Sequence, residues 1–189
     1  EMVERNIWRP KGSTSKADQL EIIEVDVGSE LPTLVAGRAD AGHVYMPAEA
    51  IGEVEANLRI LISIMKEIGP FFYTSFNGLG KTIAADPDLV QRFVNGMTKS
   101  FKWAHKKPGD AIRVMKEEFP KVNPVAIEQS VGRMIADGGW PDSPVITKQA
   151  FDANFNDLLV KTKHPAAGAK YEDLVMTEFA EKANATITV

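Results

Sequence analysis

The chain contains no cysteine, and this absence excludes several kinds of chemistry at once. Disulfide bonds, a thiolate nucleophile, zinc sites with cysteine ligands and iron–sulfur clusters all require that residue. Histidine is scarce too: His43, His105 and His164 lie far apart, and none is followed three or four positions later by a histidine or carboxylate, as a zincin motif requires. We therefore expect no catalytic residue, no metal site and no cofactor.

The sequence also lacks long apolar runs and an excess of positive charge. Its longest apolar stretch, residues 58–65 with Arg59 inside it, is far shorter than the roughly 20 residues that span a bilayer. A formal net charge of -4 argues against binding a nucleic-acid backbone, which needs clustered lysine and arginine. Residues 78–82, GLGKT, lack the first glycine of a phosphate loop, because Ser75 stands at that position; a turn is expected there.

What the first part of the chain does contain is an alternation of strand-like and helix-like segments. Residues 20–27 and 39–45 are rich in β-branched or small apolar residues and predict strands. Residues 29–37, with Ser29 as N-cap and Gly37 after the last turn, predict a helix, as do residues 47–55. Such alternation favours an α/β lobe with a mixed sheet. Weaker strand candidates are residues 57–64, 71–76 and 81–84.

From residue 86 onwards the periodicity becomes helical. Asp86, Pro87 and Asp88 form a typical helix start, with an N-cap, a proline and an acidic first turn. Further helices are expected over residues 110–119, from Pro124 to Ile135, after Thr147, and within residues 171–183. Apolar residues at helical spacing give the predicted core: Leu89, Phe93, Met97, Phe101, Phe151 and Phe155.

The stretch best suited to binding a ligand is Gly12, Ser13, Thr14 and Ser15. A glycine followed by hydroxyl side chains offers N–H and O–H donors to a carboxylate, sulfonate or phosphate, although the same residues are also ordinary loop composition. Tyr45 lies at the C-terminal end of an expected strand, beyond which open α/β sheets bind ligands. It is equally compatible with a pocket wall and with an ordinary surface aromatic.

Four stretches follow one another in the order found in a known family. Residues 10–15, PKGSTS, match a loop by which chains of that family enter their second lobe, and residues 34–41, LVAGRADA, resemble its LxxGxxDA signature. Residues 85–93, ADPDLVQRF, are similar to its xNPDLVxxF helix start, and residues 103–111 to its WxxxNPxxA motif. Over about residues 10–183 the chain thus resembles the nitrate/sulfonate/taurine-type solute-binding proteins of ABC transporters, whose relatives include binders and synthases of the thiamine pyrimidine.

This resemblance implies a type II periplasmic-binding-protein-like fold. Residues 6–75 would form an α/β lobe, the second lobe of the binding protein, and residues 76–189 a crossover and a mainly helical C-terminal region. The implied function is that of a solute-binding protein of an ABC importer, which captures a small anionic or heteroaromatic ligand in an interlobe cleft without transforming it. The ligand-binding residues carried over are Gly12, Ser13, Thr14, Ser15 and Tyr45.

The same resemblance implies the partners and the location. A small-molecule ligand and an ABC permease are expected partners, and nucleic acid is not. The expected location is periplasmic or otherwise extracytoplasmic, with the chain either soluble or lipid-anchored and not membrane-spanning. Two alternative functions stay open: an enzyme on the same scaffold, such as a thiamine-pyrimidine synthase-like protein that uses histidine and a cofactor, and a ligand sensor domain.

Two departures from the family pattern lead to a further expectation. The family has a first lobe of roughly a hundred residues ahead of the GST loop. That first lobe is missing here. Only residues 16–19 separate Ser15 from the next expected strand, whereas a crossover between parallel strands takes a dozen residues or more. We therefore expect the chain to be part of a longer functional protein.

Overall fold

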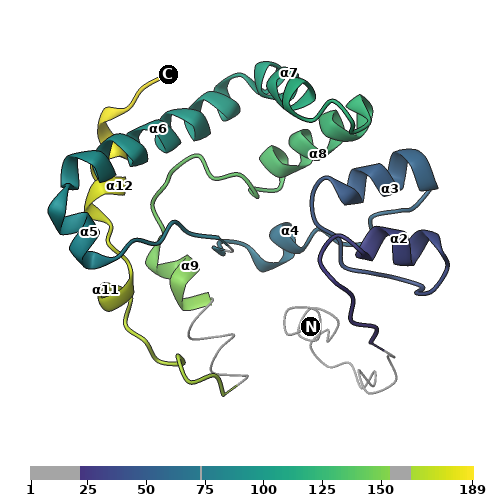
Figure 1. Cartoon of the computed structure of the whole chain (residues 1–189), viewed down its shortest axis with the longest axis horizontal. Helices are drawn as coiled ribbons and strands as arrows, with labels where there is room; N and C mark the ends of the chain where they lie inside the picture. Colours follow the sequence, from purple (N-terminus) through teal and green to yellow (C-terminus); the bar gives the residue numbers. More distant parts are fainter. Residues whose placement is uncertain (1–21, 73, 154–162) are drawn as a thin grey trace. The chain divides into compact units, whose positions relative to one another are not determined.

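The computed structural model describes residues 22–72, 74–153 and 163–189, which form helices joined by turns and extended segments (Figure 1). The chain divides into two compact units, and each unit is assembled from two separate stretches of sequence. The first comprises residues 1–67 and 109–137, and the second comprises residues 68–108 and 138–189.

The predicted α/β fold with a mixed-sheet lobe is wrong for the described residues, which contain no strand. Residues 22–27 and 39–45 run as extended chain and turns, and residues 81–84 lie in helix α5 (Gly80–Ala85). β-Branched residues favour a strand only where neighbouring strands provide a hydrogen-bonded ladder and a pleated surface to pack on. No described segment provides that partner. The division into residues 6–75 and 76–189 stays a prediction.

The first unit is built around helix α3 (Ala48–Ala56), which packs against α2 (Glu30–Val35) and α8 (Pro124–Ala136) (Figure 1). Small residues allow the close approach: Ala50 is fully buried, and a Cβ added to Gly52 would lie 3.0 Å from side-chain atoms of both Leu31 and Leu58. The buried face of α8 consists of Ala126, Ile127, Ser130 and Val131.

Two further helices belong wholly or mainly to this unit: α4 (Ile64–Ile68) and α7 (Pro108–Glu118). The predicted helices over residues 29–37, 47–55, 110–119 and 124–135 are confirmed as α2, α3, α7 and α8. Gly37 adopts a φ of 67° just after α2, the left-handed conformation that a glycine adopts without steric cost.

The second unit is organised along the 20-residue helix α6 (Pro87–Lys106), against which α12 (Glu178–Thr186) packs (Figure 1). The predicted start of α6 is confirmed, because the Asp86 side chain accepts a hydrogen bond of 2.9 Å from the backbone N–H of Leu89. Thr147 caps α9 (Lys148–Asp152) in the same way, by accepting from Ala150 at 3.2 Å. The remaining described helices are α5 and α11 (Tyr171–Leu174).

The predicted core is confirmed only in part. Phe151 is 1% exposed, whereas Leu89 and Phe93 are 53% and 46% exposed and are not core residues. The buried positions of α6 are Thr98 and Ala104, both small residues that allow another helix to approach closely. Met97 and Phe101 are half-buried. Phe155 lies outside the described residues.

Candidate functional site

Tyr45 lies in the segment that leads into α3 and is 39% exposed. The ring of His43 packs beside it, with ring centroids 4.7 Å apart and an angle of 48° between the ring planes. The carbonyl of Tyr45 accepts a hydrogen bond of 2.8 Å from the backbone N–H of Ala48, the first residue of α3. The backbone of Tyr45 is therefore joined directly to the start of the helix.

The other predicted ligand-binding residues, Gly12, Ser13, Thr14 and Ser15, lie outside the described residues, and so does the junction between Ser15 and Lys16. That these four residues share one concavity with Tyr45 stays a prediction. Tyr45 itself has the exposed aromatic surface that a pocket wall needs.

A group of polar and charged side chains joins α3 and α8. Arg133 donates from Nη1 to Glu49 Oε1 at 3.2 Å and from Nη2 to Glu53 Oε2 at 2.6 Å. The hydroxyl of Ser130 donates to the same Glu49 oxygen at 2.6 Å. We call Glu49, Glu53, Ser130 and Arg133 the α3–α8 clamp.

The side chains of the clamp are mostly shielded from solvent. The side chains of Glu49, Arg133 and Glu53 are only 11%, 26% and 29% exposed. Glu49 Oε2 is buried and has no hydrogen-bond partner among the described residues. Both side-chain hydrogen bonds to Glu49 are therefore made to one of its oxygens, Oε1, and Arg133 supplies the compensating charge. Charge-assisted bonds of this kind are about twice as strong as neutral ones.

A shallow, solvent-open hollow of about 620 Å³ lies next to the clamp. Glu53, Arg133 and Asp137, the last at the end of α8, are the charged residues that line it, and Gln129 is polar and uncharged. Its other lining residues are Val54, Gly132 and Ala136.

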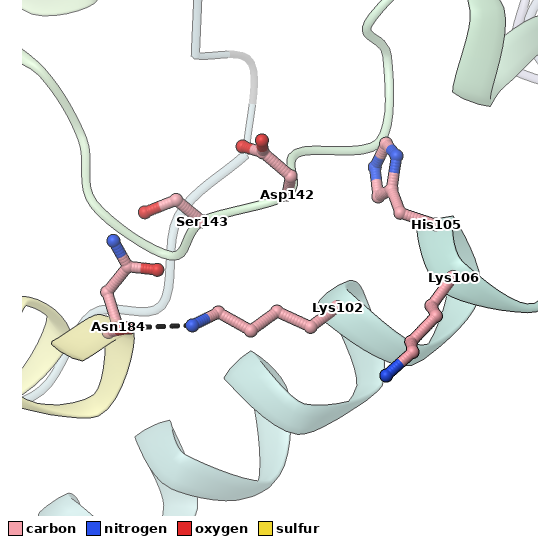
Figure 2. Close-up of a pocket in the computed structure, with 6 residues that line it drawn as sticks. All are labelled: Lys102, His105, Lys106, Asp142, Ser143 and Asn184. Atoms are coloured by element: carbon pink, nitrogen blue, oxygen red, sulfur yellow. Dashed lines mark hydrogen bonds between the residues drawn. The ribbon is translucent and has the colours of Figure 1, made fainter. Parts of the chain in front are cut away.

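The second unit has a comparable open hollow of about 480 Å³ along the C-terminal half of α6 (Figure 2). Figure 2 shows Lys102, His105 and Lys106 arising from this helix, and Lys102 reaching toward Asn184. The Lys102 ammonium donates to the carbonyls of Asn184 at 2.6 Å and Ile187 at 2.9 Å. Lys106 donates to the carbonyl of Val189. These lysines thus bind the end of α12 and the residues that follow it.

The remaining lining residues, Asp142 and Ser143, belong to the loop that leads from the first unit back into the second (Figure 2). His105 donates through Nε2 to the carbonyl of Trp140 at 2.9 Å, because a carbonyl can only accept. This histidine therefore fastens the loop to α6. His164, in turn, accepts through Nδ1 from the backbone N–H of Ala166 at 3.1 Å.

One ionisable group in the second unit has a perturbed pKa. Burial raises the pKa of Tyr171 above its usual value, and the negative charges of Glu181 and Glu172 raise it further, while Lys148 acts in the opposite direction. The Tyr171 hydroxyl donates to the carbonyl of Ile146 at 2.6 Å, and its ring meets Phe151 edge-on with centroids 5.4 Å apart. These contacts define a structural role for Tyr171.

Sequence reasoning did not find the α3–α8 clamp. Glu49 and Glu53 are four residues apart, and Ser130 and Arg133 three apart, so each pair lies on one face of its helix. That spacing was visible in the sequence. What the sequence did not reveal is which helix faces which, because the two pairs are about eighty residues apart. Among the described residues, no group of three or more histidine, cysteine, aspartate or glutamate side chains is arranged to hold a metal ion.

Comparison with known proteins identifies the class to which this chain belongs. Residues 3–111 match the protein family described as NMT1/THI5 like. Because the match covers more than half of the chain, including Gly12 to Ser15 and Tyr45, the chain belongs to this family. The resemblance to nitrate/sulfonate/taurine-type solute-binding proteins is thereby confirmed. Searches of curated proteins and of solved structures found no significant match.

The NMT1/THI5-like family consists mostly of proteins that bind small molecules, and some of its members are synthases. Solute-binding proteins of this kind are typically extracytoplasmic. Within residues 22–72, 74–153 and 163–189, no helix is long and apolar enough to cross a membrane.

Proposed function

We propose that this chain is the solute-binding component of an ABC importer and captures a small anionic or heteroaromatic ligand without transforming it. The observation that carries the proposal is the family match over residues 3–111, which contains every ligand-binding residue predicted from the sequence. The proposed partner is an ABC permease, and the proposed location is periplasmic or otherwise extracytoplasmic.

The proposed site uses two kinds of contact. Gly12 to Ser15 would bind an anionic group of the ligand through backbone N–H and hydroxyl donors. Tyr45 would cover the ligand with its ring, and its exposed fraction of 39% leaves aromatic surface for this contact. The adjacent His43 ring restricts the conformations open to Tyr45, so less entropy is lost when a ligand binds.

The test is a thermal-shift and calorimetric screen with nitrate, taurine and the thiamine pyrimidine. A ligand present at a hundred times its Kd should raise the free energy of unfolding by about 2.7 kcal/mol. If a heteroaromatic probe binds, Tyr45→Ala should weaken binding roughly 5- to 150-fold, the range found for stacking of a ring on an aromatic side chain. Tyr45→Phe keeps the ring and is the matched control.

The Gly12 to Ser15 contact has its own test. Replacing Ser13 and Thr14 with alanine should weaken binding of the anionic probes, whereas Ser100→Ala, which alters an exposed hydroxyl on α6, should not. Equal affinity in wild type, Tyr45→Ala and the double variant would refute the proposed site. Conversion of a bound probe into a product would favour the synthase alternative instead.

A further inference from the structure

The two ends of α3 are fixed in different ways. Its C-terminal end meets Asn57, which adopts the left-handed conformation, and Leu58, whose N–H donates to the carbonyl of Gly52 at 3.0 Å. Its N-terminal end continues through Pro47 and Met46 directly into Tyr45. A rotation or sliding of α3 therefore displaces the backbone that carries the Tyr45 ring.

The apolar contacts of α3 set its distance from the neighbouring helices, whereas its polar contacts are the directional ones. Ala50 and Gly52 present small surfaces, and burial of such surfaces is non-directional. Hydrogen bonds to a planar guanidinium have strict geometry. Arg133 binds Glu49 and Glu53, one turn apart on α3, at 3.2 and 2.6 Å, so it fixes the rotation of the helix.

We propose that Arg133 and Ser130 are positioning residues for the ligand site, because they hold α3 in the rotation that presents the Tyr45 ring. This inference rests on the proposed function. Both residues belong to α8, which lies beyond the family-matched residues 3–111. In this proposal, a helix outside the matched region therefore orients Tyr45, which lies within it. Neither residue touches the ligand; each acts through Glu49 and the helix.

The arrangement requires arginine in particular. The two carboxylates are bound by different nitrogens of one planar fork. A lysine ammonium is a compact point charge on a flexible stem, and it cannot hold two carboxylates in a fixed geometry in this way. Arg133→Lys therefore keeps the charge of the clamp while removing its directional constraint.

The ring of His43 provides a probe that needs no ligand. Its C–H chemical shifts depend on the position of the Tyr45 ring, whose centroid lies 4.7 Å away. The chain has only three histidines, and the His43 signal is assigned by its loss in His43→Gln. We expect this signal to move in Arg133→Lys, and to stay near its wild-type position in Glu53→Gln, which retains an acceptor for Arg133.

The matched control is Arg113→Lys, because Arg113 of α7 pairs with Glu117 in an exposed salt bridge of the same unit. All spectra are recorded where circular dichroism shows each variant to be folded. If Arg133→Lys unfolds, Ser130→Ala, which removes one bond to Glu49, replaces it. A His43 signal that moves no further than in Arg113→Lys would overturn the proposal.

Binding of taurine and the thiamine pyrimidine gives the functional readout. Loss of a preordered Tyr45 should raise the Kd of a bound probe roughly two- to tenfold in Arg133→Lys. A shifted His43 signal with an unchanged Kd would also overturn the positioning role. If wild type binds neither probe nor nitrate, the proposed function fails, and the His43 signal still decides whether Arg133 orients the segment.

Discussion

Replacing Arg133 with methionine should destabilise the protein by far more than replacing a surface arginine. The substitution keeps an apolar stem of similar length but leaves the Glu49 carboxylate, 11% exposed, without its cation. Glu49 Oε2 has no described hydrogen-bond partner to compensate the loss. Removing one partner of a fully buried ion pair costs about 3–5 kcal/mol. Because Arg133 is 26% exposed, we expect about 2–4 kcal/mol.

Urea unfolding followed by circular dichroism measures this cost as a fall in the transition midpoint at constant slope. The control is Arg113→Met, which breaks an ion pair whose side chains are 60% and 62% exposed. Exposed pairs of this kind contribute roughly 0.2–1 kcal/mol, so the control should lie close to the wild type.

A second substitution tests the cause. Adding Glu49→Gln to Arg133→Met removes the buried negative charge while retaining an acceptor for Ser130, so the double variant should recover a large part of the lost stability. The reasoning is refuted if the two arginine variants lose stability equally, or if the double variant is less stable than Arg133→Met alone.

Three further predictions concern the second unit and the helix caps. Phe151→Ala should cost about 3–5 kcal/mol in urea unfolding because the side chain is 1% exposed, whereas Phe93→Ala, at a site 46% exposed, should cost clearly less; equal costs would contradict the assigned core. Asp86→Ala should reduce the free energy of unfolding by about 1 kcal/mol, because it removes the cap of α6. Ser29→Ala should cost almost nothing, since Ser29 makes no side-chain hydrogen bond to α2. A reversed order of these two costs in urea unfolding would contradict the cap assignments. The raised pKa of Tyr171 means that folding favours the neutral form of its hydroxyl. The stability that Tyr171 contributes is therefore fully present below its pKa in the unfolded chain, about 10. This stability is lost as the pH rises through its pKa in the folded protein. Ultraviolet titration compares wild type with Tyr171→Phe. The tyrosine ionisation that wild type shows and the variant lacks should have a pKa above 10. A pKa at or below 10 for that ionisation would be inconsistent with the burial of this residue.

Local signals in the sequence predicted local structure well. The caps at Asp86 and Thr147 form the expected hydrogen bonds, because a cap involves only the residue itself and the N–H groups two or three positions later. The composition of residues 20–27 predicts a strand, whereas the described residues 22–27 are extended chain that ends in a turn. A strand, however, depends on distant partners, so its composition alone could not decide the outcome.

The same distinction separates the two parts of the candidate site. The place of Tyr45 at the end of one short segment predicts a surface role, which agrees with its exposure, while the ligand contact stays a prediction. The α3–α8 clamp depends on a pairing of helices from distant parts of the chain. In the sequence, Glu49, Glu53 and Arg133 look like ordinary solvent-facing charges on three separate turns of helix.

The way in which α12 is held on α6 has a consequence for protein engineering. Gln91 and Lys102 bind the carbonyls of Phe179, Asn184 and Ile187, so these contacts are made to the main chain and do not depend on which side chains the C-terminal helix carries. The exposed positions of α12 should accept a fluorophore or an affinity label. Ala183 is the exception, because it is fully buried and a larger side chain there would force the helices apart.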